Sequence, residues 1–171
     1  LGGLHTLEDF ENYTGKYVTP ISTNYRGFDV YECPPNGQGI VALAALNILS
    51  GFNMRDHDAV SVDRLHLEIE AIRLAYRDRN TVLGDPDFGN IPVDEWLSEK
   101  HAAQERAHIS VDQRMPDIPW SRLPAHKDTV YLTVVDKDRN AVSFINTLFY
   151  MFGSGITAPK SGVLLQNRGM G

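Results

Sequence analysis

Two stretches of alternating apolar and polar residues predict a β-hairpin near the end of the chain. In residues 129–135, every second residue from Val130 to Val134 is apolar, and the side chains of a strand alternate between its two faces. A second alternating run covers residues 141–148. The segment 136–140 between them is polar throughout, which is typical of a turn joining two strands.

The length of this turn sets the register of the hairpin. If Asp138 is the centre of the turn, Val134 faces Val142. In the same register Thr129 faces Thr147. Residues directly opposite each other have Cβ atoms about 5 Å apart, so the two threonine hydroxyls would lie close together. A slip of one residue would break this pairing.

Helical patterns dominate the earlier part of the chain. Gly39 opens an apolar stretch that reaches about Ser50 without a polar face, and we expect a buried helix there. Residues 60–79 repeat apolar side chains at i, i+4, i+7 and i+11, which predicts a helix with one apolar face. This face consists of Leu65, Ile69, Ile72 and Tyr76. A further helix is predicted over residues 93–108.

Weaker signals complete the predicted elements. Thr6, followed by Asp9, is typical of the first residues of a short helix. Residues 17–33 contain two extended segments around a turn, and residues 163–167 are predicted to form a last strand. Helices and strands occur in separate blocks, so we predict an α+β fold in which helices pack on an antiparallel sheet.

Composition and charge limit the classes of partner. The chain has 171 residues, of which 42% are hydrophobic, enough for one domain with a core. A formal net charge of −6 argues against nucleic acid and anionic membranes as partners. Cys33 is the single cysteine, so an intramolecular disulfide and a cysteine zinc cluster are excluded. The sequence does not distinguish a cytoplasmic protein from a periplasmic or secreted one.

No metal or cofactor is predicted. Asp63, His66 and Glu70 fall on one face of a predicted helix, as metal ligands would. Such clusters more often form solvated faces or local ion pairs, and we interpret this one in that way.

Short blocks distributed in order along nearly the whole chain resemble the gamma-glutamyltranspeptidase family. They include Gly2-Gly3-Leu4, Tyr25-Arg26-Gly27, Leu46-Asn47-Ile48-Leu49, His66 with Glu70-Ala71, Ala75-Tyr76 with Asp78-Arg79, Leu83 to Phe88, Val134-Val135-Asp136, Asn140 to Ser143 and Phe152 to Gly155. The order and spacing of these blocks carry the resemblance.

This resemblance implies an N-terminal-nucleophile hydrolase with an αββα sandwich, made as a precursor that cuts itself before a threonine. The matching threonine is Thr129, so residues 1–128 would belong to the large-subunit region and residues 129–171 to the small-subunit region. The new α-amino group would be the general base for the Thr129 hydroxyl. The family's second threonine matches Thr147. An acyl-enzyme would form from a gamma-glutamyl or similar small amide, and water or an amine would resolve it.

The chain departs from the family at three positions that recognise substrate. Phe149 replaces an asparagine, Arg168 replaces a glutamine, and Gly171 replaces the aspartate that pairs with the substrate α-ammonium group. An arginine repels an ammonium group and can bind a carboxylate bidentately. These changes favour acyl groups without a free α-amine, such as glutaryl amides.

Besides the acylase, a non-catalytic alternative remains open. Val130 stands where typical members repeat threonine, so the chain can also be interpreted as an unprocessed, non-catalytic structural or interaction module. Both ends resemble cuts through a longer polypeptide. We therefore expect an internal fragment that is inactive alone and has the rest of the parent chain as its partner, with a homodimer left open.

Overall fold

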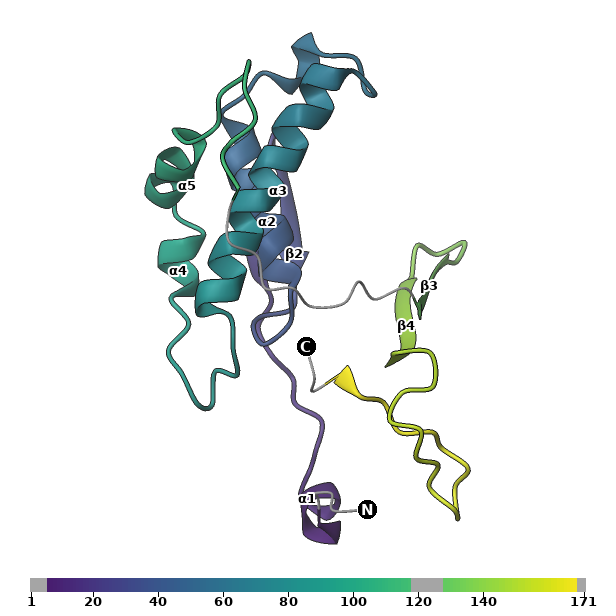
Figure 1. Ribbon diagram of the computed structural model, residues 1–171. Coiled ribbons are helices and arrows are strands. Elements are labelled where there is room, and N and C mark those ends of the chain that lie inside the picture. Colours follow the sequence, from purple (N-terminus) through teal and green to yellow (C-terminus); the bar gives the residue numbers. More distant parts are fainter. Residues whose placement is uncertain (1–5, 118–127, 169–171) are drawn as a thin grey trace. The chain divides into compact units, whose positions relative to one another are not determined.

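The computed structural model describes residues 6–117 and 128–168, and for Asp128 and Thr129 it describes the backbone alone. The chain forms two compact units, Leu1–Trp120 and Ser121–Gly171, each of which is described by itself (Figure 1). The division into two units does not test the predicted subunit boundary before Thr129, which stays a prediction.

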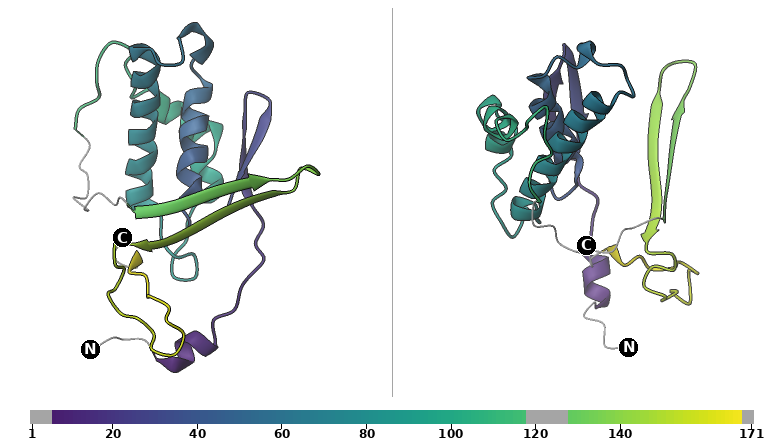
Figure 2. Two further views of the ribbon diagram at one scale, coloured as in Figure 1. Left: turned by 90° about the vertical axis from the view of Figure 1, so that its right-hand side faces the viewer. Right: turned by 45° about the horizontal axis from the view of Figure 1, so that its top comes forward.

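The first unit combines helices with one antiparallel strand pair. Its elements are α1 (Leu7–Glu11), β1 (Ile21–Tyr25), β2 (Phe28–Glu32), α2 (Gly39–Ser50), a 3₁₀ turn (Met54–Asp56), α3 (Val62–Val82), α4 (Val93–Trp96) and α5 (Glu99–Arg106). Thr6 caps α1 in a capping box with Asp9, as predicted. The two extended segments predicted within residues 17–33 are β1 and β2, which pair antiparallel. Figure 2 shows α2 and α3 side by side.

Helix α2 is the centre of the first unit, and its predicted burial is confirmed. Ile40, Leu43 and Ile48 are almost completely buried. One end of α2 packs into a cluster with Ala75 and Trp96, while the other end packs into a cluster with Leu74 and Met54. A helix that is apolar on all sides needs neighbours all round, and α3, α5 and the strand pair supply them.

Helix α3 packs through a face other than the one that its periodicity marks. Leu67, Ala71, Leu74 and Ala75 are buried. By contrast, the predicted apolar face is 37–55% exposed; it consists of Leu65, Ile69, Ile72 and Tyr76. The alanines let the axes of α2 and α3 approach closely. Helix α3 therefore has two apolar faces, and within the described residues only one of them is covered.

The helix predicted over residues 93–108 is wrong as a continuous element. The structure has α4 up to Trp96 and α5 from Glu99 instead. Ser98 interrupts the helix because its Oγ accepts a hydrogen bond from the amide of His101 (3.1 Å) and donates one to the carbonyl of Glu95 (2.7 Å). The serine thus caps a new helix.

The second unit contains the predicted hairpin, formed by β3 (Asp128–Val135) and β4 (Ala141–Phe149). Val134 pairs with Val142, which confirms the predicted register. In the turn, the Asp136 carboxylate accepts hydrogen bonds of 2.9 Å from the Asn140 side chain and from the amides of Asn140 and Asp138. The bond from the Asn140 side chain has the largest effect, and the three bonds together hold the pKa of Asp136 below its ordinary value.

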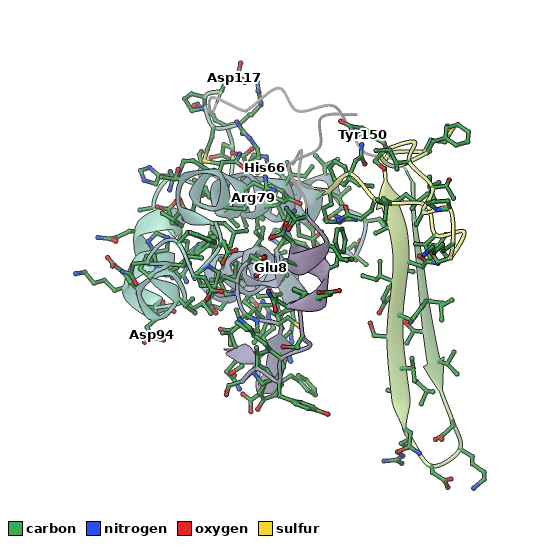
Figure 3. All side chains as sticks on the ribbon, turned by 90° about the horizontal axis from the view of Figure 1, so that it is seen from below. Glu8, His66, Arg79, Asp94, Asp117 and Tyr150 are labelled. Carbon is green, nitrogen blue, oxygen red and sulfur yellow. The ribbon has the colours of Figure 1, made fainter. Side chains whose placement is uncertain are left out.

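Apolar side chains cover both faces of the hairpin (Figure 3). Val130, Leu132 and Val134 lie exposed on one face, while Tyr131 and its partner Ile145 lie exposed on the other. A strand pair with two apolar faces is typical of a sheet buried between two layers.

The strand predicted over residues 163–167 does not form. Among the described residues, this segment makes one isolated bridge, between Thr157 and Leu164. The segment beside it turns at Gly153 (φ 53°) and Gly155 (φ 71°), so it cannot offer an extended edge for a ladder. None of the helices in the described residues is both long and apolar enough to cross a membrane.

Candidate functional site

The predicted threonine pair lies where the hairpin ladder becomes irregular. Regular pairing runs from Val135 with Ala141 to Val130 with Asn146, and the next pair is Asp128 with Phe149. One residue of β3, Thr129, therefore lies opposite two residues of β4, Thr147 and Leu148. Such a β-bulge bends the strand and is frequent next to active sites.

The register prediction is thus confirmed up to Val130 and differs by the bulge at Thr129. The backbone of Thr129 adjoins Thr147, as the turn length predicts, but Leu148 shares the position. The turn fixes the ladder in its vicinity, whereas the bulge lies at the far end of the hairpin, next to the pair of Asp128 with Phe149. A catalytic role for either threonine stays a prediction.

Thr147 accepts two hydrogen bonds through its hydroxyl oxygen. The amide of Phe149 donates to Thr147 Oγ1 at 3.1 Å, in a local turn made by the threonine side chain. Arg168 Nη2 donates to the same atom at 3.3 Å. Arg168 lies 21 residues further along the chain, so the folded chain brings this cation to the threonine.

Phe149 has an unusual backbone for an aromatic residue. Its φ of 76° lies in the left-handed region, where a bulky side chain costs about 1–2 kcal/mol and an asparagine costs less. The Arg168 guanidinium lies over the Phe149 ring, 5.0 Å from its centroid, and the ring of Tyr150 packs edge-on at 5.1 Å. The two predicted substrate-binding residues, Phe149 and Arg168, are therefore in contact with each other.

Three of the four predicted site residues thus form one cluster, in which Arg168 joins Thr147 to Phe149. The fourth, Thr129, adjoins the cluster through its backbone. Gly171, where the family has an aspartate, lies outside the described residues.

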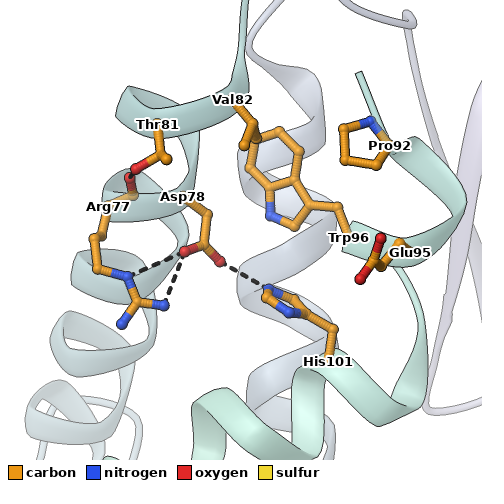
Figure 4. Close-up of a pocket in the computed structure, with 8 residues that line it drawn as sticks. All are labelled: Arg77, Asp78, Thr81, Val82, Pro92, Glu95, Trp96 and His101. Atoms are coloured by element: carbon orange, nitrogen blue, oxygen red, sulfur yellow. Dashed lines mark hydrogen bonds and ion pairs between the residues drawn. The ribbon is translucent and has the colours of Figure 1, made fainter. Parts of the chain in front are cut away.

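A second polar cluster, in the first unit, was not predicted from the sequence. Arg77, Asp78 and His101 line a surface cavity of about 330 Å³ together with Trp96 (Figure 4). Ligand atoms of Asp78, His101 and Glu105 lie within 4.8 Å of one another, as in some metal sites. The only sequence signal is the spacing of His101 and Glu105, one turn apart on a helix.

Arg77 already supplies the positive charge in this cluster. Its Nε and Nη2 donate to Asp78 Oδ1 at 3.1 and 2.8 Å, and Nη2 also donates to Glu105. Asp78 Oδ2 is hydrogen-bonded to His101 Nε2 at 2.8 Å. Burial lowers the pKa of Arg77, but the bonds to Glu105 and Asp78 outweigh burial and raise it. We interpret the cluster as an ion-pair network that joins α3 to α5.

The charged residues Asp63, His66 and Glu70 do not converge on one ligand. Asp63 is exposed, His66 Nε2 is hydrogen-bonded to the carbonyl of Ser110 at 2.8 Å, and Glu70 pairs with Arg73 at 2.6 Å. The interpretation as local pairs agrees with these contacts, but Glu70 is buried, so the three residues do not form one solvated face.

One family model and several known proteins match the chain. The family model described as gamma-glutamyltranspeptidase matches residues 1–171. The glutathione hydrolase-like YwrD proenzyme of Bacillus subtilis (strain 168) is 40% identical over 98% of this chain, and the glutathione hydrolase proenzyme of Escherichia coli (strain K12) is 39% identical over 98%. The crystal structure of cephalosporin acylase from Bacillus halodurans matches 98% of the chain with a TM-score of 0.85 and 41% identity.

This chain spans only 31%, 30% and 30% of the lengths of these three proteins. The predicted fold class is confirmed: the helices and antiparallel strands form part of an N-terminal-nucleophile hydrolase fold.

Proposed function

The chain belongs to the gamma-glutamyltranspeptidase family, and on this premise we propose that the whole protein is an amidohydrolase that works through a threonine acyl-enzyme. The precursor cuts itself between Asp128 and Thr129. The Thr129 hydroxyl adds to the Asp128 carbonyl, the peptide nitrogen leaves as the α-amine, and water hydrolyses the resulting ester.

In the mature enzyme Thr129, the residue that made the cut, is also the nucleophile that attacks the substrate. The α-amine of Thr129 removes the proton from its own hydroxyl while Oγ1 attacks the amide carbonyl of the substrate. The leaving amine takes that proton, and an ester between Thr129 and the acyl group remains. Water then releases the acid, or an acceptor amine forms a new amide. Residues 129–171 begin the small subunit in this proposal.

The bulge at the end of the hairpin is the observation that carries this proposal. It sets position 129 against Thr147, whose hydroxyl oxygen is itself held by Phe149 and Arg168. A nucleophile needs a fixed hydrogen-bonding neighbour, and strands hold such a neighbour more firmly than loops do.

The intact mass of the full-length protein tests the cut. We expect two polypeptides, the smaller of which begins with Thr-Val-Tyr-Leu on N-terminal sequencing. A full-length protein that stays one chain and hydrolyses no acyl amide supports the alternative, a non-catalytic structural module. The full-length protein is used because this chain spans only 31% and 30% of the lengths of the two proenzymes that it matches.

Phe149 and Arg168 favour a second, narrower candidate: an acylase for amides without a free α-amine, such as glutaryl amides. The guanidinium carbon of Arg168 lies 5.0 Å from the centroid of the Phe149 ring, and Nη2 of the same group donates to the hydroxyl oxygen of Thr147. A positive charge there repels the α-ammonium group of a gamma-glutamyl substrate and attracts a carboxylate.

We therefore expect kcat/KM for glutaryl-p-nitroanilide to exceed that for gamma-glutamyl-p-nitroanilide by about 10-fold or more in the full-length enzyme, equivalent to about 1.4 kcal/mol. In the double variant Phe149→Asn, Arg168→Gln the preference should shift towards the gamma-glutamyl compound. Comparable efficiencies for both compounds in the unaltered enzyme would refute the narrower candidate and leave the threonine mechanism intact.

A further inference from the structure

Residues 109–116, which follow α5, form neither a helix nor a strand, yet they run along α3 (Figure 1). We call them the strap. At the start of the strap, the carbonyl of Ser110 is hydrogen-bonded to His66 Nε2 at 2.8 Å. Ile109 packs against the buried cluster that contains Leu74 of α3. The strap is thus attached to α3 by one polar and one apolar contact at this end.

A buried ion pair holds the other end of the strap. The Met115 side chain is 7% exposed, and the Met115 amide donates to Glu70 Oε2 at 2.9 Å. Arg73 Nη1 donates to the carbonyl of Met115 at 3.3 Å, and Nη2 donates to the carbonyl of Pro116 at 2.8 Å. Glu70 and Arg73 also pair with each other at 2.6 Å. Together the two side chains bind successive backbone groups of the strap.

The strap lies on the N-terminal side of the proposed cut. Asp117 is the last residue of the first unit that the structure describes, and the strap ends immediately before it. The partners of the strap belong to the same unit, so a cut before Thr129 would not remove them. On the other side of the cut, Val130 pairs with Asn146 in the hairpin ladder. The cut therefore falls between two held points, Pro116 and Val130.

We propose that the strap is a positioning device for self-cleavage. By fixing the chain before the cut, it raises the rate at which the Thr129 hydroxyl attacks the Asp128 carbonyl in the folded precursor. This inference rests on the proposed function and adds residues to it, because it gives Glu70 and Arg73 a role in making the enzyme. Both are positioning residues, since they act through the strap and not on the reacting atoms.

The physical reason is the freedom that the strap removes. Without it, the stretch between the two held points would grow from residues 117–129 to residues 107–129, because α5 ends at Arg106. The entropy of closing the longer stretch slows the reaction by about twofold. Lost alignment adds to this effect, since an attack within one chain depends on the geometry in which the reacting atoms are held.

Met115→Asp in the full-length precursor tests the inference. The variant removes the apolar anchor and brings a carboxylate beside Glu70, so the strap should detach from α3. We expect the precursor, made by cell-free translation, to cut itself about 10-fold more slowly in a time course on denaturing gels. Val111→Asp is the matched control: it places the same charge in the strap at a side chain that is 61% exposed, and cutting should stay within about twofold.

The turnover of the processed enzyme separates positioning from general stabilisation. Once the chain is cut, the strap has no further part in the reaction, so kcat per processed molecule should stay within about twofold in Met115→Asp. Arg73→Met serves as a second variant and should slow the cut as well. Arg73→Lys should recover part of that loss, because it keeps a charged donor for the carbonyls of the strap. If the unaltered precursor cuts too fast to follow, all variants are compared in a Thr129→Ser background.

Two results would overturn the inference. An unchanged rate of cutting in both Met115→Asp and Arg73→Met would mean that the strap does not position the cut. Equal losses in the rate of cutting and in kcat would mean that the strap only stabilises the fold. Either result leaves the proposed function standing. A full-length protein that is never cut before Thr129 overturns the proposed function, and this inference falls with it.

Discussion

We expect Thr129→Ala in the full-length protein to leave one uncut chain and to lower hydrolysis of acyl p-nitroanilides by at least about 10³-fold. In the proposed mechanism the variant lacks the hydroxyl that attacks the Asp128 carbonyl, so no new α-amine would be released. It also lacks the atom that would carry the acyl group. Both losses come from one oxygen, and denaturing electrophoresis with a p-nitroaniline release assay measures them on the same sample.

Two further variants control this experiment. Thr129→Ser keeps a hydroxyl and should still cut itself, at a reduced rate. Thr133→Ala removes another threonine of β3, one that pairs with Ser143 in the regular part of the ladder; cutting and hydrolysis should both stay within about twofold. Self-cleavage before residue 129 in the alanine variant would disprove the assignment of the nucleophile.

Glu70→Ala lowers the free energy of unfolding by about 3–5 kcal/mol. The Glu70 side chain is 2% exposed and accepts hydrogen bonds from Arg73 Nη1 (2.6 Å) and from the amide of Met115 (2.9 Å). The alanine leaves the Arg73 side chain, which is only 11% exposed, without its carboxylate partner, and it leaves a buried amide without an acceptor. Urea denaturation of the chain, followed by far-ultraviolet circular dichroism, measures the loss.

Glu68→Ala is the matched control, because Glu68 belongs to the same helix and forms the same kind of pair. Its partner Arg64 lies at 2.9 Å, but both side chains are 33% exposed. Water solvates such a pair well, so its loss should cost about 0.5 kcal/mol or less. If both variants lowered the free energy of unfolding equally, burial would not be the reason why the Glu70 pair contributes more than the Glu68 pair.

Local signals in the sequence predicted the elements that depend on local chemistry. The polar segment around Asp138 gave the register of the hairpin, since a turn fixes the residues that flank it. The unbroken apolar stretch from Gly39 predicted a buried helix, because a helix that is apolar on all sides needs neighbours all round. Ser98 carries a local capping signal as well, but the helical pattern on both sides of it masked the break between α4 and α5.

Features that depend on contacts distant in sequence could not be predicted in this way. Helix α3 offers two apolar faces, and the choice between them depends on the close approach of α2 to Ala71 and Ala75. The bond from Arg168 to Thr147 joins residues 21 apart, and the bond from Arg77 to Glu105 joins residues 28 apart. Resemblance to the family pointed to Arg168 as a site residue, but not to its contact with Thr147.

The apolar residues on both faces of the hairpin have a consequence for biosynthesis. While the protein is being made, β3 and β4 expose Leu132 and Ile145 to water on opposite sides and cannot hide both by folding on themselves. Until other residues cover these two faces, the hairpin is prone to aggregate through them, and a chaperone that binds exposed apolar strands would protect it.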